Sequence, residues 1–141
     1  MIGKNNPLNI RTSSHYQWNG QNGATRGFCN FEGVELCRRA GAYLLMRSYR
    51  RSKVFTLEQV IHRWAPTCEN PTNAYIDFVS RCTSISAAQM LCTSSDFASV
   101  LAAMELFEQG IALEKRTAYY ATAKASYLYV IQNYHIMPYE N

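Results

Sequence analysis

Residues 93–110 read TSSDFASVLAAMELFEQG, and their apolar side chains recur at the spacing of one helix face. The positions that make up this face are Phe97, Val100, Leu101 and Met104. The next position on the same face is Glu108, which is followed by Gln109 and the helix-ending residue Gly110. The pattern predicts a central helix from Thr93 to Glu108, capped by Ser94, Ser95 or Asp96, with a carboxylate where a core residue is expected.

A carboxyl group held against apolar surface is disfavoured in its charged form, so we expect the Glu108 pKa to rise toward values useful to a general acid. A glutamate of this kind is typical of glycosidases. The structural alternative is a glutamate at a helix end that points to solvent. The apolar periodicity of residues 93–110 is compatible with both a catalytic acid and a solvent-facing glutamate.

The composition indicates one compact domain spanning residues 1–141. Hydrophobic residues make up 48% of the chain and charged residues 17%, and no apolar run is long enough to span a membrane. The sequence starts Met1-Ile2-Gly3-Lys4-Asn5-Asn6, without the apolar segment of a secretory signal. We therefore expect a protein made in the cytoplasm and released or delivered to its site of action.

The formal net charge of +4 suits an anionic polymer such as nucleic acid, teichoic acid or peptide-bearing cell-wall glycan. Basic residues gather between Arg38 and Lys53, but no nucleic-acid-binding motif accompanies them, and we expect no nucleic-acid partner. The five cysteines are irregularly spaced and form no Cys-x-x-Cys pair, so we expect buried free thiols, no metal site and no cofactor. A catalytic cysteine assisted by one of the three histidines is the alternative.

Residues 1–33 are rich in Asn, Gly, Ser and Gln and predict a lobe of loops and short strands. Its hairpin is expected to pair residues 16–19 with residues 27–31 through a turn at 20–23. Residues 34–141 predict a helical lobe. The helices expected there run from Val34 to near Arg51, from a Thr56–Gln59 capping box to Pro66, from an Asn70 cap onward, from Thr93 to Glu108, and from Thr117 to Tyr134. The expected fold class is α+β and mostly α-helical.

Two segments carry candidate substrate contacts. In residues 5–11, amide side chains surround an apolar pair, and Asn6, Asn9 and Arg11 offer donors and acceptors to sugar hydroxyl and N-acetyl groups; a polar turn is the alternative. Trp18 offers an aromatic face for a sugar ring or plugs the small lobe. In residues 63–75 the candidates are Trp64, Glu69, Asn70 and Tyr75, although Glu69 and Asn70 also suit the start of a helix.

These residues in this order resemble a family of phage virion-associated and endolysin-type peptidoglycan-degrading proteins with lysozyme-like folds. The resemblance covers Asn5 to Arg11, Trp18, and the segment from Trp64 to Tyr75, and it ends at Glu108-Gln109-Gly110. In those relatives the glutamate helix comes first, whereas here it follows the Asn-rich segment. The resemblance therefore implies a circularly permuted lysozyme-like domain in which Glu108 returns in space to the N-terminal lobe.

The activity that the resemblance implies is cleavage of the β-1,4 glycan strand of peptidoglycan by a muramidase or lytic transglycosylase, with Glu108 as the catalytic acid and Glu32 as a weaker candidate for a second carboxylate. Partners would be the glycan strands, with an immunity or delivery protein in the case of a secreted effector. The alternatives are a non-catalytic cell-wall-binding protein and a cysteine peptidase acting on wall peptides.

Overall fold

A computed structural model describes residues 1–67 and 70–140 of the chain. It contains the two-stranded sheet β1 (Gln21–Thr25) and β2 (Phe28–Phe31), followed by helices only. The helices are α1 (Val34–Tyr43), which continues as the π-helix η1 (Leu44–Tyr49), α2 (Leu57–Trp64), α3 (Thr72–Thr83), α4 (Ser94–Gln109), the short 3-10 helix η2 (Leu113–Lys115) and α5 (Arg116–Asn133). The expected α+β, mostly helical class is confirmed at this coarse level.

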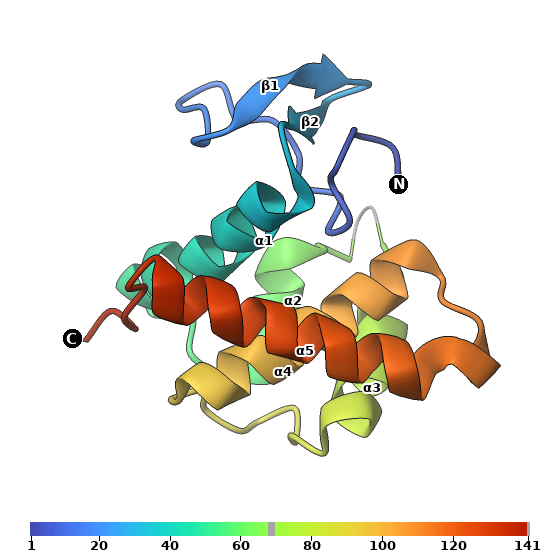
Figure 1. Ribbon diagram of the computed structural model, residues 1–141. Coiled ribbons are helices and arrows are strands. Elements are labelled where there is room, and N and C mark those ends of the chain that lie inside the picture. Colours follow the sequence, from blue (N-terminus) through green and yellow to red (C-terminus); the bar gives the residue numbers. More distant parts are fainter. Residues whose placement is uncertain (68–69, 141) are drawn as a thin grey trace.

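Helix α4 is the centre of the helical lobe, with α5 and α1 packed on one side and α3 on another (Figure 1). Every residue from Phe97 to Leu106 is buried, so the helix is enclosed on all sides. Its cap is Thr93, one residue earlier than the expected Ser94, Ser95 or Asp96. The Thr93 hydroxyl accepts from Asp96 N, and the Asp96 carboxylate in turn accepts from Thr93 N.

The hairpin forms with a different first strand from the one expected. Residues 16–19 are not a strand, and β1 instead covers Gln21–Thr25, antiparallel to β2. The tight turn lies at Arg26-Gly27, where both residues have positive φ. A two-residue turn of this kind matches the twist of the strands and needs φ above zero at both positions, which Gly27 adopts freely. The predicted turn at residues 20–23 is a β-bulge region at the start of β1.

Two other helix starts were predicted with different success. The Thr56–Gln59 capping box is present and begins α2 as expected. The Asn70 cap was wrong: Pro71 occupies the cap position of α3, and Asn70 Nδ2 donates to Pro66 O instead. A proline fixes its own φ and so can precede a helix without a side-chain cap.

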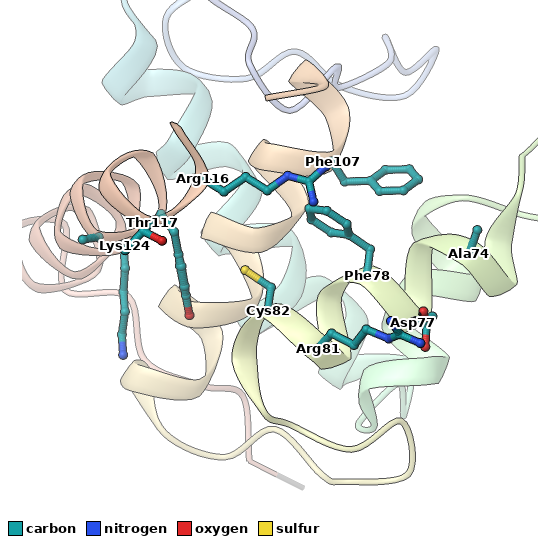
Figure 2. Close-up of a pocket in the computed structure, with 11 residues that line it drawn as sticks. Ala74, Asp77, Phe78, Arg81, Cys82, Phe107, Arg116, Thr117 and Lys124 are labelled. Atoms are coloured by element: carbon teal, nitrogen blue, oxygen red, sulfur yellow. Dashed lines mark ion pairs between the residues drawn. The ribbon is translucent and has the colours of Figure 1, made fainter. Parts of the chain in front are cut away.

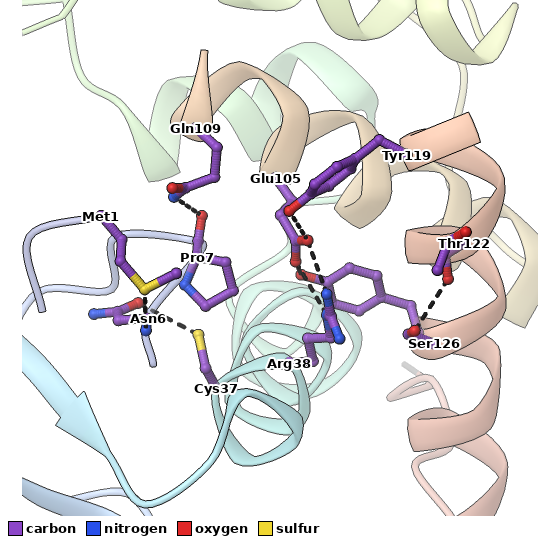
Figure 3. Close-up of polar contacts among 11 residues, drawn as sticks. Met1, Asn6, Pro7, Cys37, Arg38, Glu105, Gln109, Tyr119, Thr122 and Ser126 are labelled. Atoms are coloured by element: carbon purple, nitrogen blue, oxygen red, sulfur yellow. Dashed lines mark hydrogen bonds and ion pairs between the residues drawn. The ribbon is translucent and has the colours of Figure 1, made fainter. Parts of the chain in front are cut away.

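The N-terminal segment is held against α1 by the buried side chain of Asn6. Its Nδ2 donates to the carbonyls of Ile10 and Cys29 at 3.0 and 2.9 Å, and its Oδ1 accepts from Ile10 N at 2.9 Å. The Cys37 thiol of α1 donates to the same Oδ1 (Figure 3). Leu8 then packs on Gly41, where a Cβ would lie 2.4 Å from Leu8 Cδ1, so a larger residue at position 41 would have to displace the Leu8 side chain.

A wholly buried carboxylate, Glu105, joins three helices (Figure 3). Arg38 of α1 donates to it through Nε at 3.1 Å and Nη2 at 2.9 Å. From α5, the Tyr119 and Tyr127 hydroxyls donate at 2.9 and 2.8 Å. Burial and the Glu105 charge raise the pKa of Tyr119 to about 12, so its hydroxyl stays a donor. A buried charge needs a full set of partners, and this one has two on each oxygen.

The variant Arg38→Ala leaves the Glu105 carboxylate buried without its cation. We expect a loss of about 3–5 kcal/mol in the free energy of unfolding, because an uncompensated buried charge is costly. Chemical denaturation followed by circular dichroism measures it. Arg39→Ala, on the same helix but stacked on Tyr134, is the matched control. Equal losses in the two variants would contradict the role given to the ion pair.

Candidate active site

The Glu108 carboxylate receives hydrogen bonds from three separate parts of the chain. Asn9 Nδ2 donates to Oε1 at 3.0 Å. The Tyr75 hydroxyl and Trp64 Nε1 donate to Oε2 at 2.8 and 3.3 Å. We expected this side chain to lie against apolar surface, and the structure instead surrounds the carboxyl oxygens with polar donors. The arrangement fixes the direction in which the carboxyl group points.

The N-terminal segment brings Asn9 to the end of α4. Gln109 Nε2 of α4 donates to Pro7 O, which ties the segment to the helix beside Glu108 (Figure 3). Asn9 adopts φ 52°, a left-handed conformation that asparagine tolerates better than most residues. Its buried Oδ1 has no hydrogen-bond partner within the described residues. The left-handed backbone of Asn9 and the contact between Gln109 and Pro7 thus hold the Asn9 amide toward Glu108.

Tyr75 comes from α3 and is only 2% exposed. Burial, and then the charge and hydrogen bond of Glu108, raise the pKa of its phenol well above the ordinary value. The hydroxyl therefore remains protonated and donates to Glu108. Its ring stacks on Phe107, with centroids 4.0 Å apart. Phe107 directly precedes Glu108 on α4, so this stacking also holds the Tyr75 hydroxyl in place. Tyr75 positions Glu108, and its burial argues against the substrate contact that we had expected of it.

Glu108 lies in a cleft of about 610 Å³. The N-terminal lobe forms one wall of this cleft, and the end of α2 and the loop after α2 form another. Side chains on its walls include Arg11, which lies over the Phe28 ring at 4.8 Å, and Arg63, which lies over the Tyr49 ring at 5.6 Å. The other lining residues that bear on the argument are Asn9, Tyr16, Ser48, Ser52, Trp64 and Asn70. A volume of this size accommodates a ligand of several rings.

The predicted substrate contacts divide into two groups. Asn9, Arg11, Trp64 and Asn70 line the cleft with Glu108, as a common site requires. Asn6 is fully buried with both side-chain atoms engaged by the protein, so we do not retain it as a ligand contact. Trp18 lines a different pocket, and Glu69 lies outside the described residues. Glu32 is exposed and does not line the cleft.

Sequence reasoning missed the part of the cleft contributed by η1, and it missed Arg63 of α2. Ser48 and Tyr49 come from the π-helix, and Arg63 directly precedes Trp64. Helix periodicity gave no signal for Arg63, because adjacent helical residues do not share a face, yet both Arg63 and Trp64 line the cleft at the end of α2. No sequence signal that we know marks the π-helix, whose wider turn moves Ser48 and Tyr49 relative to an α-helix.

A larger cavity, of about 780 Å³, lies between α3 and α5 over the end of α4 (Figure 2). Phe78 and Phe107 form its apolar wall, and Arg116 lies over the Phe78 ring at 5.0 Å. Arg81 pairs with Asp77 at 3.0 Å at its edge. Since it contains neither Glu108 nor any predicted substrate contact, we place the candidate chemistry in the smaller cleft.

Three of the cysteines, Cys29, Cys37 and Cys82, are poorly suited to nucleophilic catalysis. Burial raises the pKa of Cys29 and Cys82, and it raises the pKa of Cys37 to about 12. A catalytic cysteine needs the opposite shift, because the thiolate is the nucleophile.

Within residues 1–67 and 70–140, no three His, Cys, Asp or Glu side chains gather as metal ligands. Among the same residues, no helix is long and apolar enough to cross a membrane.

No protein-family model matches the sequence. The chain is 36% identical over 110 residues to Protein P5 of Pseudoalteromonas phage PM2, an alignment that covers 75% of this chain and 68% of that protein. Identity at this level over most of both chains indicates common descent and a shared fold. The chain therefore belongs to the same family as Protein P5 of Pseudoalteromonas phage PM2.

Proposed function

We propose that this protein is a peptidoglycan glycosidase that cleaves the β-1,4 glycan strand with Glu108 as general acid. The observation that carries the proposal is the convergence of Asn9, Trp64 and Tyr75 on one half-buried carboxylate in a cleft. A wall-binding protein without turnover has no need to orient a carboxylate so fully. Its hallmark would be a Glu108 side chain free in solvent.

The proposal includes a lysozyme-like, circularly permuted fold. It is supported by a contact between the first and last segments that carry the resemblance. Asn9, in the Asn-rich segment near the start of the chain, donates a hydrogen bond to Glu108 at the end of α4. Gln109 makes a second contact of the same kind, to Pro7 O. These are the contacts that a permuted domain needs in order to rebuild the site.

In the proposed reaction, the hydrogen bonds of Glu108 favour Oε1 as the oxygen that transfers the proton. A carboxyl oxygen has two lone pairs, and both of those on Glu108 Oε2 are engaged by Tyr75 and Trp64. Among the described residues, the Asn9 side chain is the donor to Oε1, and the proposal gives the second lone pair of Oε1 to the proton. In the proposed reaction, Oε1 transfers this proton to the leaving glycosidic oxygen while positive charge develops on the sugar ring.

Among the described residues that line the cleft, Glu108 is the acidic one. Capture of the sugar intermediate by water gives a hydrolase, and capture by the sugar's own 6-hydroxyl gives a lytic transglycosylase. Both outcomes fit a single glutamate, and the proposal covers both. The charges of Arg11 and Arg63 suit the carboxylates that peptidoglycan carries. The phage origin of the relative fits a protein that reaches the cell wall after release or delivery.

Digestion of purified peptidoglycan by the wild type and Glu108→Gln tests the proposal, with mass spectrometry of the soluble products. We expect the wild type to release muropeptides with reducing or 1,6-anhydro ends, and Glu108→Gln to be slower by a factor of about 10² or more, because the amide cannot donate the proton. Glu114→Gln, at an exposed position in η2, is the control.

If the folded wild type releases no glycan from several wall types, the glycosidase proposal fails and the binding protein takes its place. Shortened peptides on intact glycan, abolished by thiol alkylation, would indicate the cysteine peptidase instead.

Tyr75→Phe and Tyr119→Phe form a matched pair, since each removes one hydroxyl donor from a carboxylate on α4. We expect Tyr75→Phe to lower kcat roughly 10-fold or more with KM little changed, because its hydrogen bond stabilises the charge that develops on Glu108 as the proton leaves, and a hydrogen bond to a charged group is worth about 1.5–3 kcal/mol. Tyr119→Phe should lower the melting temperature and leave kcat unchanged. Steady-state kinetics on soluble glycan strands separates the two, and equal kcat values for them would refute the positioning role of Tyr75.

A further inference from the structure

An aromatic trio, made of the exposed Tyr16 and Tyr43 and the partly buried Trp18, lies on the N-terminal lobe and the end of α1. The Tyr16 and Trp18 rings meet edge to face at 5.1 Å, and the Trp18 and Tyr43 rings do so at 6.1 Å. Tyr16 is 49% exposed and Tyr43 is 42% exposed. The three rings touch one another, and a contiguous apolar patch at a surface is typical of a binding site.

Trp18 and Tyr43 line a pocket of about 280 Å³ that is separate from the Glu108 cleft. The polar groups at this pocket are the amides of Gln17 and Asn19 and the guanidinium of Arg39. The turn that carries Trp18 is fixed by Gly20, which has φ +81° and touches Leu36 so closely that a Cβ would lie 2.3 Å from its Cδ1. The pocket is thus a built feature of the hairpin and α1.

The trio connects this pocket with the cleft. Tyr16 lines the Glu108 cleft and contacts Trp18, which lines the pocket. A second link lies where α1 meets η1: Tyr43 lines the pocket, and the next residue, Leu44, lines the cleft. A long ligand in the cleft therefore meets Trp18 and Tyr43 if it continues past Tyr16.

We propose that the aromatic trio and its pocket bind a further sugar unit of a glycan strand whose cleaved bond lies at Glu108. The inference rests on the proposed function and adds to it a second binding region outside the cleft. The rings would cover the apolar face of a pyranose. The amides of Gln17 and Asn19 would bind hydroxyl or N-acetyl groups, and Arg39 would bind a carboxylate of the strand.

The chain has two tryptophans, one in each region, which makes the inference testable by fluorescence. In a Glu108→Gln background, Trp64→Phe leaves Trp18 as the reporter, and Trp18→Phe leaves Trp64. Each protein is titrated with long soluble glycan strands and with the disaccharide of N-acetylglucosamine and N-acetylmuramic acid. We expect long strands to change the emission of both reporters.

Affinity provides the second measurement. In the Glu108→Gln background, Trp18→Ala should weaken binding of long strands about 10-fold and leave disaccharide binding in the cleft nearly unchanged, since aromatic anchors dominate such contacts. Tyr129→Ala, an exposed tyrosine on α5 away from both regions, should bind like its parent.

The outcomes separate this inference from the proposed function. If long strands change the Trp64 emission but not that of Trp18, and Trp18→Ala binds normally, the second region is refuted while the cleft stands. If Trp18 responds although the wild type cleaves no wall, the glycan-binding region is supported and the glycosidase proposal fails. If neither tryptophan responds, the inference is refuted.

Discussion

The ion pair between Arg38 and Glu105 is the interaction on which the rest of the structure depends. It joins α1 to α4 inside the core, and the hydroxyls of Tyr119 and Tyr127 add α5 to the same carboxylate. Because burying an unpaired charge is so costly, the three helices cannot separate or slide without a large penalty. The position of α4 is thereby fixed, and with it the direction of Glu108 one turn further along.

Two carboxylates on one helix thus have different surroundings and different parts in the structure. Glu105 is fully buried, paired with an arginine and inaccessible to any ligand. Glu108 is half-buried, faces a cleft, and accepts from three neutral donors among the described residues. Neutral donors orient the carboxyl group of Glu108 without the opposite charge that fully occupies Glu105, so Glu108 remains able to act on a ligand. That contrast is why we assign the chemistry to Glu108.

The sequence predicted the helices well, because periodicity and capping residues are local signals: the α2 capping box and the span of α5 are close to expectation. It did not reveal that α4 is enclosed on all sides. The apolar periodicity that pointed to Glu108 therefore did not predict that Glu105 is also buried. The cleft membership of Asn9 and Trp64 was predicted, whereas Asn6 was misassigned, since a buried amide and a ligand-binding amide look identical in sequence. Tertiary contacts decide between such alternatives.

The crystal structure of the Glu108→Gln variant with a bound peptidoglycan tetrasaccharide tests the central claim most directly. The account predicts that a glycosidic oxygen lies within about 3 Å of the side chain of residue 108, the distance needed for proton transfer. The hydrogen bonds of Tyr75 and Trp64 to that side chain should be retained. A glycan bound elsewhere on the molecule, with the cleft beside residue 108 empty, would contradict the claim that Glu108 is the acid of a glycosidase.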